Sequence, residues 1–177
     1  MISLQKRYLS AQTCCLTGHR PNKLPWRTDE LDPRCLALKR KLYDIADALY
    51  CSGIRHFISG MALGCDTYFC EAIIELRDEH PDIVLEAAIP FKGQSDLWSE
   101  ADKSRYNYLV SQCDFETVLQ EEFSKGCMLA RDRYMVDNSS VVIAVYNGSK
   151  GGTQYTVNYA KKSDREIIIL DPDAGNQ

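Results

Sequence analysis

The stretch VVIAVYNGSKGGTQYTVNYA, residues 141–160, decides the fold class. An apolar run ends at Tyr146, glycines and a Thr follow, and the rest has the composition of a helix. A buried strand, a glycine-rich turn and a helix in this order are typical of an α/β protein. Free backbone N–H groups and the helix dipole attract anions to the start of such a helix. We therefore expect an anion at Gly151, Gly152 and Thr153; a turn that needs glycine for its geometry alone is the alternative.

The same alternation extends along the rest of the chain. Short apolar, β-branched runs predict strands at residues 13–17, 54–59, 83–89, 115–119, 140–146 and 166–170. Helical spacing of the apolar residues predicts helices around 38–49, 69–76, 96–112, 124–138 and 153–163. Strands that alternate with helices form a mainly parallel sheet with helices on both faces. The sequence predicts an α/β three-layer sandwich of about six strands, and a single domain over residues 1–177.

Composition and charge narrow the range of functions. The chain has 177 residues, of which 45% are hydrophobic and 26% are charged, a globular composition. Its net charge of −4 makes nucleic acid an unlikely partner, although a local basic pocket is compatible with it. No apolar run reaches the ~20 residues that span a bilayer, and the first twenty residues lack a signal-peptide core. We therefore expect a cytoplasmic protein without a membrane partner.

The cysteines do not indicate a metal site. There are eight, scattered along the chain without any C-x-x-C pair, and the three His residues are not at zinc-ligand spacing. Most lie inside apolar segments, where Cys behaves as a small hydrophobic residue. We expect buried or incidental thiols and no bound metal.

Unusual loops follow the strands at one edge of the predicted sheet. They read TGHRPNKLPW (17–26), SGMALGCD (59–66), PFKGQSDLW (90–98) and NGSKGGTQ (147–154). The connections at the opposite edge, such as CSG and EHPD, are short and ordinary. Ligands of parallel α/β sheets bind beyond the carboxyl ends of the strands. The glycines, aromatic residues and polar groups of these loops therefore predict a ligand site at that edge.

The first two loops offer groups for an anion and for a sugar. Gly18 allows a sharp turn, and His19 with Arg20 can meet a phosphate, because a guanidinium binds phosphate in a bidentate manner. A surface turn with solvated charges is the alternative. Gly60 and Gly64 bracket a tight turn before Asp66, which can cap a helix and can also hold a ribose hydroxyl or another loop. This turn is not a Walker loop, which needs a Lys and a Ser or Thr after its last glycine.

The third loop and the predicted helix at 124–138 allow more than one interpretation. Phe91 and Trp98 can stack on a base, or serve as core or lid residues. Asp132 falls on the apolar stripe of the helix at 124–138 and needs a partner. Either Arg131 or Arg133 can pair with it, which leaves the other to reach over the site. A solvated helix face with an internal ion pair is the alternative.

Five segments together resemble one family. They are TGHRP (17–21), SGMALGCD (59–66), IPFKGQ (89–94), RDRYMVDNSSVVIAVYNG (131–148) and GGTQYTVNYA (151–160). In this order they resemble the SLOG superfamily, whose Rossmann-like members include the LOG phosphoribohydrolases and DNA-processing protein A, and most of all its YpsA-like proteins. The resemblance implies a Rossmann-like fold, a nucleotide ligand such as an ADP-ribose- or NAD-like molecule, and a homodimer.

The resemblance also bears on catalysis. LOG enzymes have an Arg, which matches Arg131, and a Gly-Thr-x-x-Glu motif, which matches Gly152, Thr153 and Thr156. Thr156 stands at the position of the catalytic Glu, and a hydroxyl does not replace a tuned carboxylate as an acid or base. Binding without LOG-type cleavage is therefore favoured, although Asp66, Asp132 or Glu122 are candidates for a rearranged acid.

The sequence thus leads to three hypotheses. The favoured one is a nucleotide-binding sensor or regulator; the alternatives are a nucleotide or nucleotide-sugar hydrolase and a single-stranded DNA-binding protein. DNA binding is disfavoured by the net charge and by the lack of a basic stripe with aromatic residues. No catalytic residue is assigned. The candidate ligand-binding residues are Thr17, Gly18, His19, Arg20, Ser59, Gly60, Met61, Gly64, Asp66, Phe91, Gln94, Arg131, Arg133, Gly151, Gly152 and Thr153.

Overall fold

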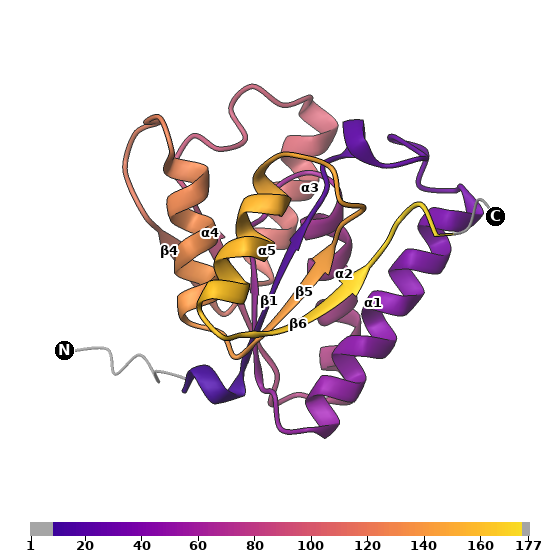
Figure 1. The fold of residues 1–177 in the computed structure, drawn as a ribbon. Coiled ribbons are helices and arrows are strands. Elements are labelled where there is room, and N and C mark those ends of the chain that lie inside the picture. The colour runs from indigo at the N-terminus through magenta and orange to yellow at the C-terminus, as the bar shows by residue number, and fades with distance from the viewer. Residues whose placement is uncertain (1–8, 175–177) are drawn as a thin grey trace.

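Strands and helices alternate through residues 9–174, the part of the chain that the computed structural model describes. The strands are β1 (Thr13–Gly18), β2 (His56–Ser59), β3 (Val84–Ile89), β4 (Phe115–Val118), β5 (Val141–Val145) and β6 (Glu166–Leu170). The α-helices are α1 (Pro33–Cys51), α2 (Cys65–Glu79), α3 (Glu100–Ser111), α4 (Cys127–Asp137) and α5 (Gly152–Lys162) (Figure 1). Residues 1–8 and 175–177 lie outside the described range. The predictions of a single domain over 1–177 and of no signal peptide extend into these residues.

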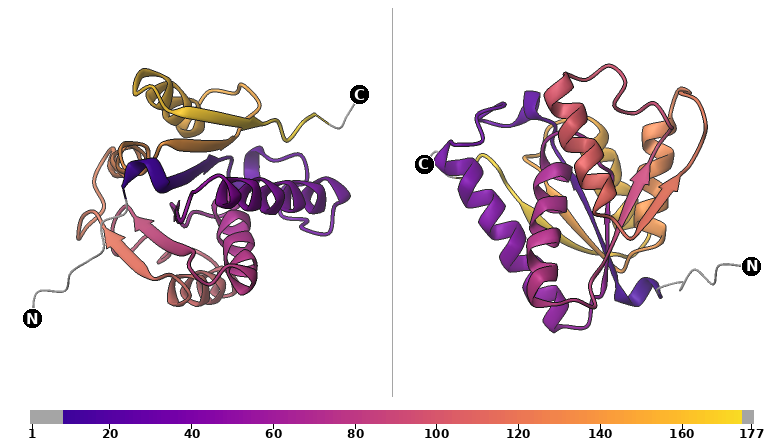
Figure 2. Two further views of the ribbon diagram at one scale, coloured as in Figure 1. Left: turned by 90° about the horizontal axis from the view of Figure 1, so that it is seen from below. Right: turned by 180° about the vertical axis from the view of Figure 1, so that it is seen from behind.

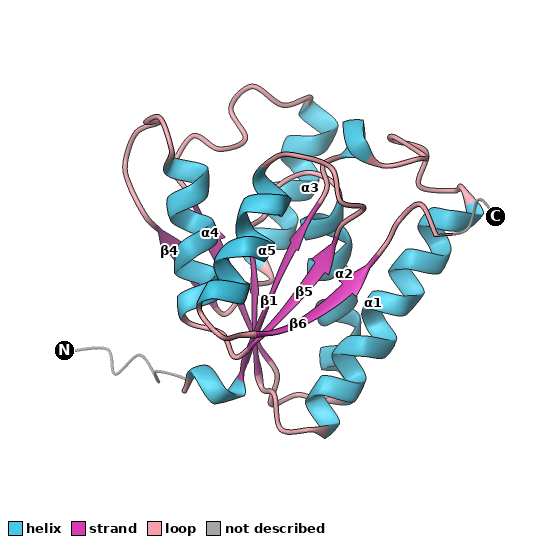
Figure 3. Cartoon of the chain, viewed as in Figure 1, coloured by secondary structure: helices cyan, strands magenta, loops and turns pink. Residues whose placement is uncertain are grey.

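All six strands belong to one sheet in the order β4-β3-β2-β1-β5-β6. Every neighbouring pair is parallel, and the register places Cys14 of β1 between Phe57 of β2 and Val141 of β5 (Figure 3). β1 and β5 are almost completely buried because helices cover both of their faces. The α/β, Rossmann-like three-layer fold with a parallel sheet is confirmed.

The helices form two layers with different cores. α1, α2 and α3 cover one face, where Phe57, Phe69 and Leu85 are wholly buried (Figure 2). α4 and α5 cover the other face with a smaller core that includes Ile58 and Val142. α4 and α5 pack against each other; α4 lies over β1 and β3, and α5 lies over β1, β5 and β6. Side chains of α4 and α5 can therefore meet over the central strands.

The helix boundaries follow local capping groups. Asp32 caps α1 and accepts a hydrogen bond from the Arg34 backbone N–H at 2.8 Å, and Pro33 takes the first helical position. Ser99 caps α3 in the same way, through the Asp102 N–H at 3.1 Å. The predicted helix at 96–112 therefore begins at Glu100, which leaves residues 90–99 as a loop.

The cysteines, the helix lengths and the grouping of possible metal ligands add three facts about the described range. All eight cysteines are free, and six of them are buried. Among residues 9–174, no helix is long and apolar enough to cross a membrane. In the same range, no group of three or more His, Cys, Asp or Glu side chains is placed to hold a metal ion.

Candidate ligand-binding site

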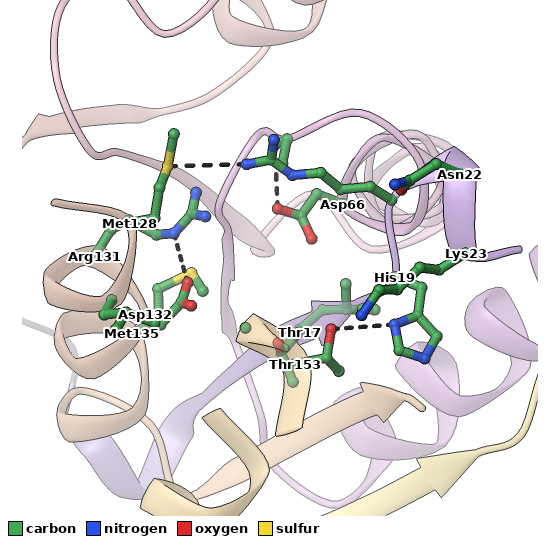
Figure 4. Close-up of a pocket in the computed structure, with 16 residues that line it drawn as sticks. Thr17, His19, Asn22, Lys23, Asp66, Met128, Arg131, Asp132, Met135 and Thr153 are labelled. Carbon is green, nitrogen blue, oxygen red and sulfur yellow. Dashed lines mark hydrogen bonds and ion pairs between the residues drawn. The ribbon is translucent and has the colours of Figure 1, made fainter. Parts of the chain in front are cut away.

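A cavity opens at the carboxyl ends of β1 and β5, where the strand order reverses. β2, β3 and β4 follow on one side of β1, and β5 and β6 lie on the other. The loops of the two central strands diverge at such a switch point and leave a crevice for ligands. The cavity has a volume of about 240 Å³. It is lined by Leu16, Thr17, Gly18, His19, Arg20, Asn22, Lys23, Ala62, Asp66, Met128, Leu129, Arg131, Asp132, Met135, Gly152 and Thr153 (Figure 4).

Arg131 of α4 is a buried cation in the wall of this cavity. Its Nε donates a hydrogen bond to Asp132 Oδ1 at 2.8 Å, and its Nη1 donates to the carbonyl oxygen of Gly60. Burial by itself would lower the pKa of Arg131, but the carboxylates of Asp132 and Asp66 raise it above its ordinary value. Arg131 therefore stays charged and joins α4 to the loop after β2.

Gly60 is a glycine because the loop backbone approaches this ion pair closely. A Cβ at position 60 would overlap the Arg131 guanidinium and lie 2.8 Å from Asp66 Oδ2. Gln94 holds the same loop from its other side, since its Nε2 donates to the Met61 carbonyl oxygen at 2.9 Å. Met61 itself has a positive φ of 57°, which a residue with a side chain adopts rarely. The loop after β2 is thus fitted around Arg131.

Asp66 is a buried carboxylate in the first turn of α2. Its Oδ2 accepts a hydrogen bond from the Ala62 N–H at 3.1 Å, and only 6% of the residue is exposed. Burial raises the pKa of Asp66 to about 6, against the opposing effects of Arg131 and of this hydrogen bond. The group therefore changes its charge closer to neutrality than an ordinary aspartate and does so inside the cavity.

Thr156 of α5 is wholly buried. Its hydroxyl donates to Asp132 Oδ2 at 3.1 Å and lies 3.0 Å from the Gly152 carbonyl oxygen. Asp132 is thereby held on one oxygen by Arg131 and on the other by Thr156. The hydroxyl of Thr156 is therefore part of a structural network that ties α5 to α4.

The start of α5 forms the other end of the cavity. Gly151 has a φ of 145°, and no acidic residue occupies the first turn of α5. A Cβ on Gly152 would meet no atom within 4 Å, so the space beside this turn is open. Lys23 reaches the preceding carbonyl of Lys150, and Arg20 lies across the cavity with its Nη2 3.9 Å from Met128 Sδ. Two cations and a helix N-terminus thus surround a space that suits an anion.

His19 closes the cavity below this turn. Its Nε2 lies 2.8 Å from Asn147 Oδ1. Its Nδ1 lies 3.4 Å from Thr153 Oγ1 (Figure 4). The carbonyl of His19 also accepts from the Cys65 N–H at 3.4 Å. Gly64, with a φ of 91°, permits this approach, since a Cβ there would lie 2.8 Å from the His19 oxygen.

The structure separates the predicted site residues into three groups. The first group lines the cavity and comprises Thr17, Gly18, His19, Arg20, Asp66, Arg131, Gly152 and Thr153. The second group supports it from behind or beside it and comprises Ser59, Gly60, Met61, Gly64, Gln94 and Gly151. Phe91 and Arg133 lie elsewhere: Phe91 packs against Phe123 with 5.5 Å between ring centroids, and Arg133 bonds the Tyr155 hydroxyl at 2.8 Å.

Several cavity residues were not among the predicted ones. Asn22, Lys23, Met128, Leu129 and Met135 line the wall, and Asn147 orients His19. Lys23 lies in the same unusual loop as His19, so its positive charge next to His19 and Arg20 could have marked it as a candidate site residue. The two methionines lie on the apolar stripe of α4, where nothing in the sequence separates a cavity lining from ordinary core.

The parallel sheet and the cavity at its switch point define a Rossmann-like protein with a ligand site at the strand ends. Residues 14–173 match the family model YpsA, the YspA SLOG family, and the chain belongs to this family. It is similar to the SPbeta prophage-derived protein YoqJ of Bacillus subtilis, with 36% identity over 157 residues, which cover 80% of this chain and 92% of YoqJ. A UPF0398 protein of Bacillus thuringiensis is 28% identical over 153 residues, or 83% of this chain and 81% of that protein.

Solved structures with a similar fold include DNA processing protein A. The fold matches the protein from Streptococcus pneumoniae with a TM-score of 0.61 and 16% identity over 91% of this chain, which spans only 50% of that protein. The protein from Helicobacter pylori, whose structure describes a single-stranded DNA binding mode, matches with a TM-score of 0.61 and 18% identity. The match covers 92% of this chain and 66% of that protein. TM1055 matches with a TM-score of 0.51 and 14% identity, over 88% of this chain and 72% of TM1055. At these identities the likeness concerns the fold alone.

Proposed function

We propose that this protein binds a nucleotide or nucleotide derivative between β1 and β5 and acts as a sensor or regulator without LOG-type cleavage. One observation carries the proposal. The cavity joins the N-terminus of α5 to three cations, Arg20, Lys23 and Arg131, while the position of the LOG acid holds Thr156. A phosphate cradle is therefore combined with an acid position that a structural hydroxyl occupies.

In this proposal the phosphate sits at Gly151–Thr153, with Arg20 or Arg131 opposite. The backbone N–H groups of the first helical turn donate to the phosphate oxygens, and the guanidinium balances its charge. Asp66, across the cavity, is placed to accept from a ribose hydroxyl. A volume of about 240 Å³ is below the ~300–1,000 Å³ usual for whole ligands. We therefore expect the cavity to enclose the phosphate and sugar of an ADP-ribose- or NAD-like ligand and not the entire molecule.

Cleavage of an N-glycosidic bond requires a group that can give or take a proton at the sugar. Thr156 cannot fill this role near neutral pH, and its hydroxyl is already engaged with Asp132. Both carboxylate oxygens of Asp132 in turn accept hydrogen bonds, one from Arg131 and the other from Thr156. Glu122 is exposed in the loop between β4 and α4 and does not line the cavity. These contacts favour binding over catalysis.

A hydrolase is the second candidate, and Asp66 is the observation that favours it. This carboxylate lines the cavity, and burial raises its pKa to about 6, a value suited to a general acid or base. In this alternative Asp66 would exchange the proton and Arg131 would stabilise negative charge on the reacting group.

Single-stranded DNA binding is a weaker candidate. It comes from the likeness to DNA processing protein A, a likeness of fold at 16–18% identity. The net charge of −4 opposes it, because non-specific DNA binding depends on neutralising many phosphates. The cavity volume of about 240 Å³ also suits a small ligand better than a strand.

A cytoplasmic location and a homodimer are part of the proposal. The eight free cysteines support a reducing compartment such as the cytoplasm, since disulfides form and persist in oxidising compartments. The homodimer rests on the family resemblance alone, and light scattering during gel filtration would test it.

The proposal is tested by ligand-dependent thermal stabilisation with AMP, ADP-ribose and NAD. A ligand at one hundred times its Kd stabilises a protein by about 2.7 kcal/mol, or about 5–11 °C for a chain of this size. A Cβ on Gly152 would meet no atom within 4 Å, and Gly152→Glu, which adds a negative charge beside the proposed phosphate, is expected to abolish this shift. Asn158→Glu adds the same charge on the exposed side of α5 and is expected to keep it. A shift that survives Gly152→Glu would show that the site is misplaced.

A further inference from the structure

His19 connects the two loops that flank the phosphate position. It follows β1, is 2% exposed and lines the cavity. Its Nε2 contacts Asn147 after β5, and its Nδ1 faces the hydroxyl of Thr153 in the first turn of α5. The Thr153 hydroxyl therefore lies between the imidazole of His19 and the proposed phosphate.

The hydrogen bonds around Asn147 determine which ring nitrogen carries the proton. Asn147 Nδ2 donates to Asp173 Oδ2 at 2.8 Å, so its Oδ1 is the atom that faces His19. An oxygen only accepts, and the 2.8 Å contact therefore needs a proton on His19 Nε2. The Asn147 backbone N–H also points at this nitrogen, but at the longer distance of 3.4 Å. In the neutral ring, Nδ1 is left with its lone pair toward Thr153.

The surroundings of His19 favour this neutral form near pH 7. Burial lowers the pKa of His19, and the positive charge of Lys23 from the loop after β1 adds to this. The hydrogen bond that His19 donates to Asn147 Oδ1, and the carboxylates of Asp173 and Asp171 after β6, act in the opposite direction but do not cancel the lowering. Tyr146 contributes an uncharged ring 5.9 Å away. In the free protein, the Thr153 hydroxyl therefore donates to Nδ1 at 3.4 Å.

We propose that binding of a dianionic phosphate at the start of α5 is coupled to the uptake of one proton by His19. This inference rests on the proposed function of the cavity. The Thr153 hydroxyl has a single hydrogen, which bonds Nδ1 in the free protein. When a phosphate oxygen takes that hydrogen bond, Nδ1 loses its donor and receives a proton from the solvent. The new Nδ1–H then donates to Thr153 Oγ1, and the imidazolium faces the dianion.

The coupling favours a terminal phosphate over a phosphodiester. A phosphomonoester carries about two negative charges near neutral pH, whereas a diester carries one, so the monoester stabilises the imidazolium more. A nucleotide with a free phosphate end therefore fits the site better than the backbone of a nucleic acid.

The pH dependence has a defined sign. The ligand raises the pKa of His19 from its lowered value in the free protein. Affinity is then highest below the pKa of the free protein and falls as the pH rises toward the pKa of the complex. Between these two values we expect a fall of up to about tenfold per pH unit, the limit for one coupled proton.

Calorimetric titration with inorganic sulfate tests the coupling directly. Sulfate keeps its two charges throughout pH 5–9, so every proton taken up belongs to the protein. The proton number follows from the binding enthalpies in two buffers with different ionisation enthalpies. We expect up to one proton per bound sulfate, and a matching shift of the His19 ring signal in NMR spectra. AMP is expected to bind more tightly than its 3′,5′-cyclic diester.

Two variants identify the group that takes up the proton. His19→Gln retains a side-chain N–H for Asn147 but cannot be protonated, and Thr153→Val removes the hydroxyl but keeps the shape. Both are expected to abolish proton uptake. Uptake that persists in His19→Gln and disappears in Asp66→Asn would assign the proton to Asp66 and overturn the inference. So would sulfate binding by the unmodified protein without proton uptake or a shift of the His19 signal. A protein that binds neither sulfate, phosphate nor AMP would instead refute the proposed function.

Discussion

Thr156→Val is expected to destabilise the protein by about 2 kcal/mol through the loss of one hydrogen bond. Thr156 is wholly buried, and its hydroxyl donates to Asp132 Oδ2 at 3.1 Å. Val has nearly the same shape, so no cavity forms, but one carboxylate oxygen loses its donor. Hydrogen bonds to charged groups contribute about 1.5–3 kcal/mol, and a buried acceptor without a partner costs a similar amount. For a chain of 177 residues, this corresponds to a fall of about 4–8 °C in Tm.

Denaturant unfolding of four proteins separates this hydrogen bond from other effects of the substitution. They are the unmodified chain, Thr156→Val, Asp132→Asn and the double variant. If the hydroxyl acts through the carboxylate, Thr156→Val costs less in the Asp132→Asn background, by about 1 kcal/mol or more. Thr156→Ser keeps the hydroxyl and is expected to lose only about 1 kcal/mol for the missing methyl. Equal costs of Thr156→Val in both backgrounds would refute the role given to this contact.

Three further predictions concern charge, DNA and catalysis. Burial raises the pKa of Asp66 to about 6, so the native state holds this proton while the unfolded chain has already lost it above pH ~4. Ionisation of Asp66 therefore lowers the free energy of unfolding as the pH rises from 4 to 6. The free energy of unfolding of Asp66→Asn is expected to rise by roughly 3 kcal/mol relative to the unmodified chain over this range, measured by denaturant unfolding at each pH. Filter binding at physiological salt is expected to show little affinity for single-stranded oligonucleotides; a submicromolar Kd with a steep salt dependence would favour the DNA-binding alternative. AMP, ADP-ribose and NAD are expected to survive long incubation, and release of base or ribose phosphate that Asp66→Asn abolishes would favour the hydrolase instead.

The strands were predictable because the central part of a parallel sheet is buried on both faces. Continuous apolar runs such as VVIAV at 141–145 have no other stable environment in a soluble domain, and β5 occupies these residues. The alternation of strands and helices also predicted which edge of the sheet carries the ligand loops, because the carboxyl ends of parallel strands lie at the same edge. Element boundaries depended on single caps: Ser99 delays α3 to Glu100, against the predicted start at 96.

The partners of individual side chains were not predictable in the same way. Arg131 and Arg133 both flank Asp132 in the sequence, and a helix turns by about 100° per residue, so the two point in different directions. Which of them faces the cavity depends on how α4 rests on the sheet. Arg131 reaches Gly60, and Arg133 reaches Tyr155 on the outer surface. The bond between Thr156 and Asp132 likewise requires α4 and α5 to be neighbours, which the local sequence does not encode.

The central position of β1 has a consequence for synthesis on the ribosome. β1 is the first strand of the described residues, yet its second neighbour is β5, and Cys14 pairs with Val141. Until residue 141 has emerged, one side of β1 lacks its strand partner β5. Contacts between such distant residues form slowly, and open strand edges invite aggregation. The middle of the sheet therefore stays incomplete in the nascent chain until β5 has emerged, and the cavity at β1 and β5 is completed only then.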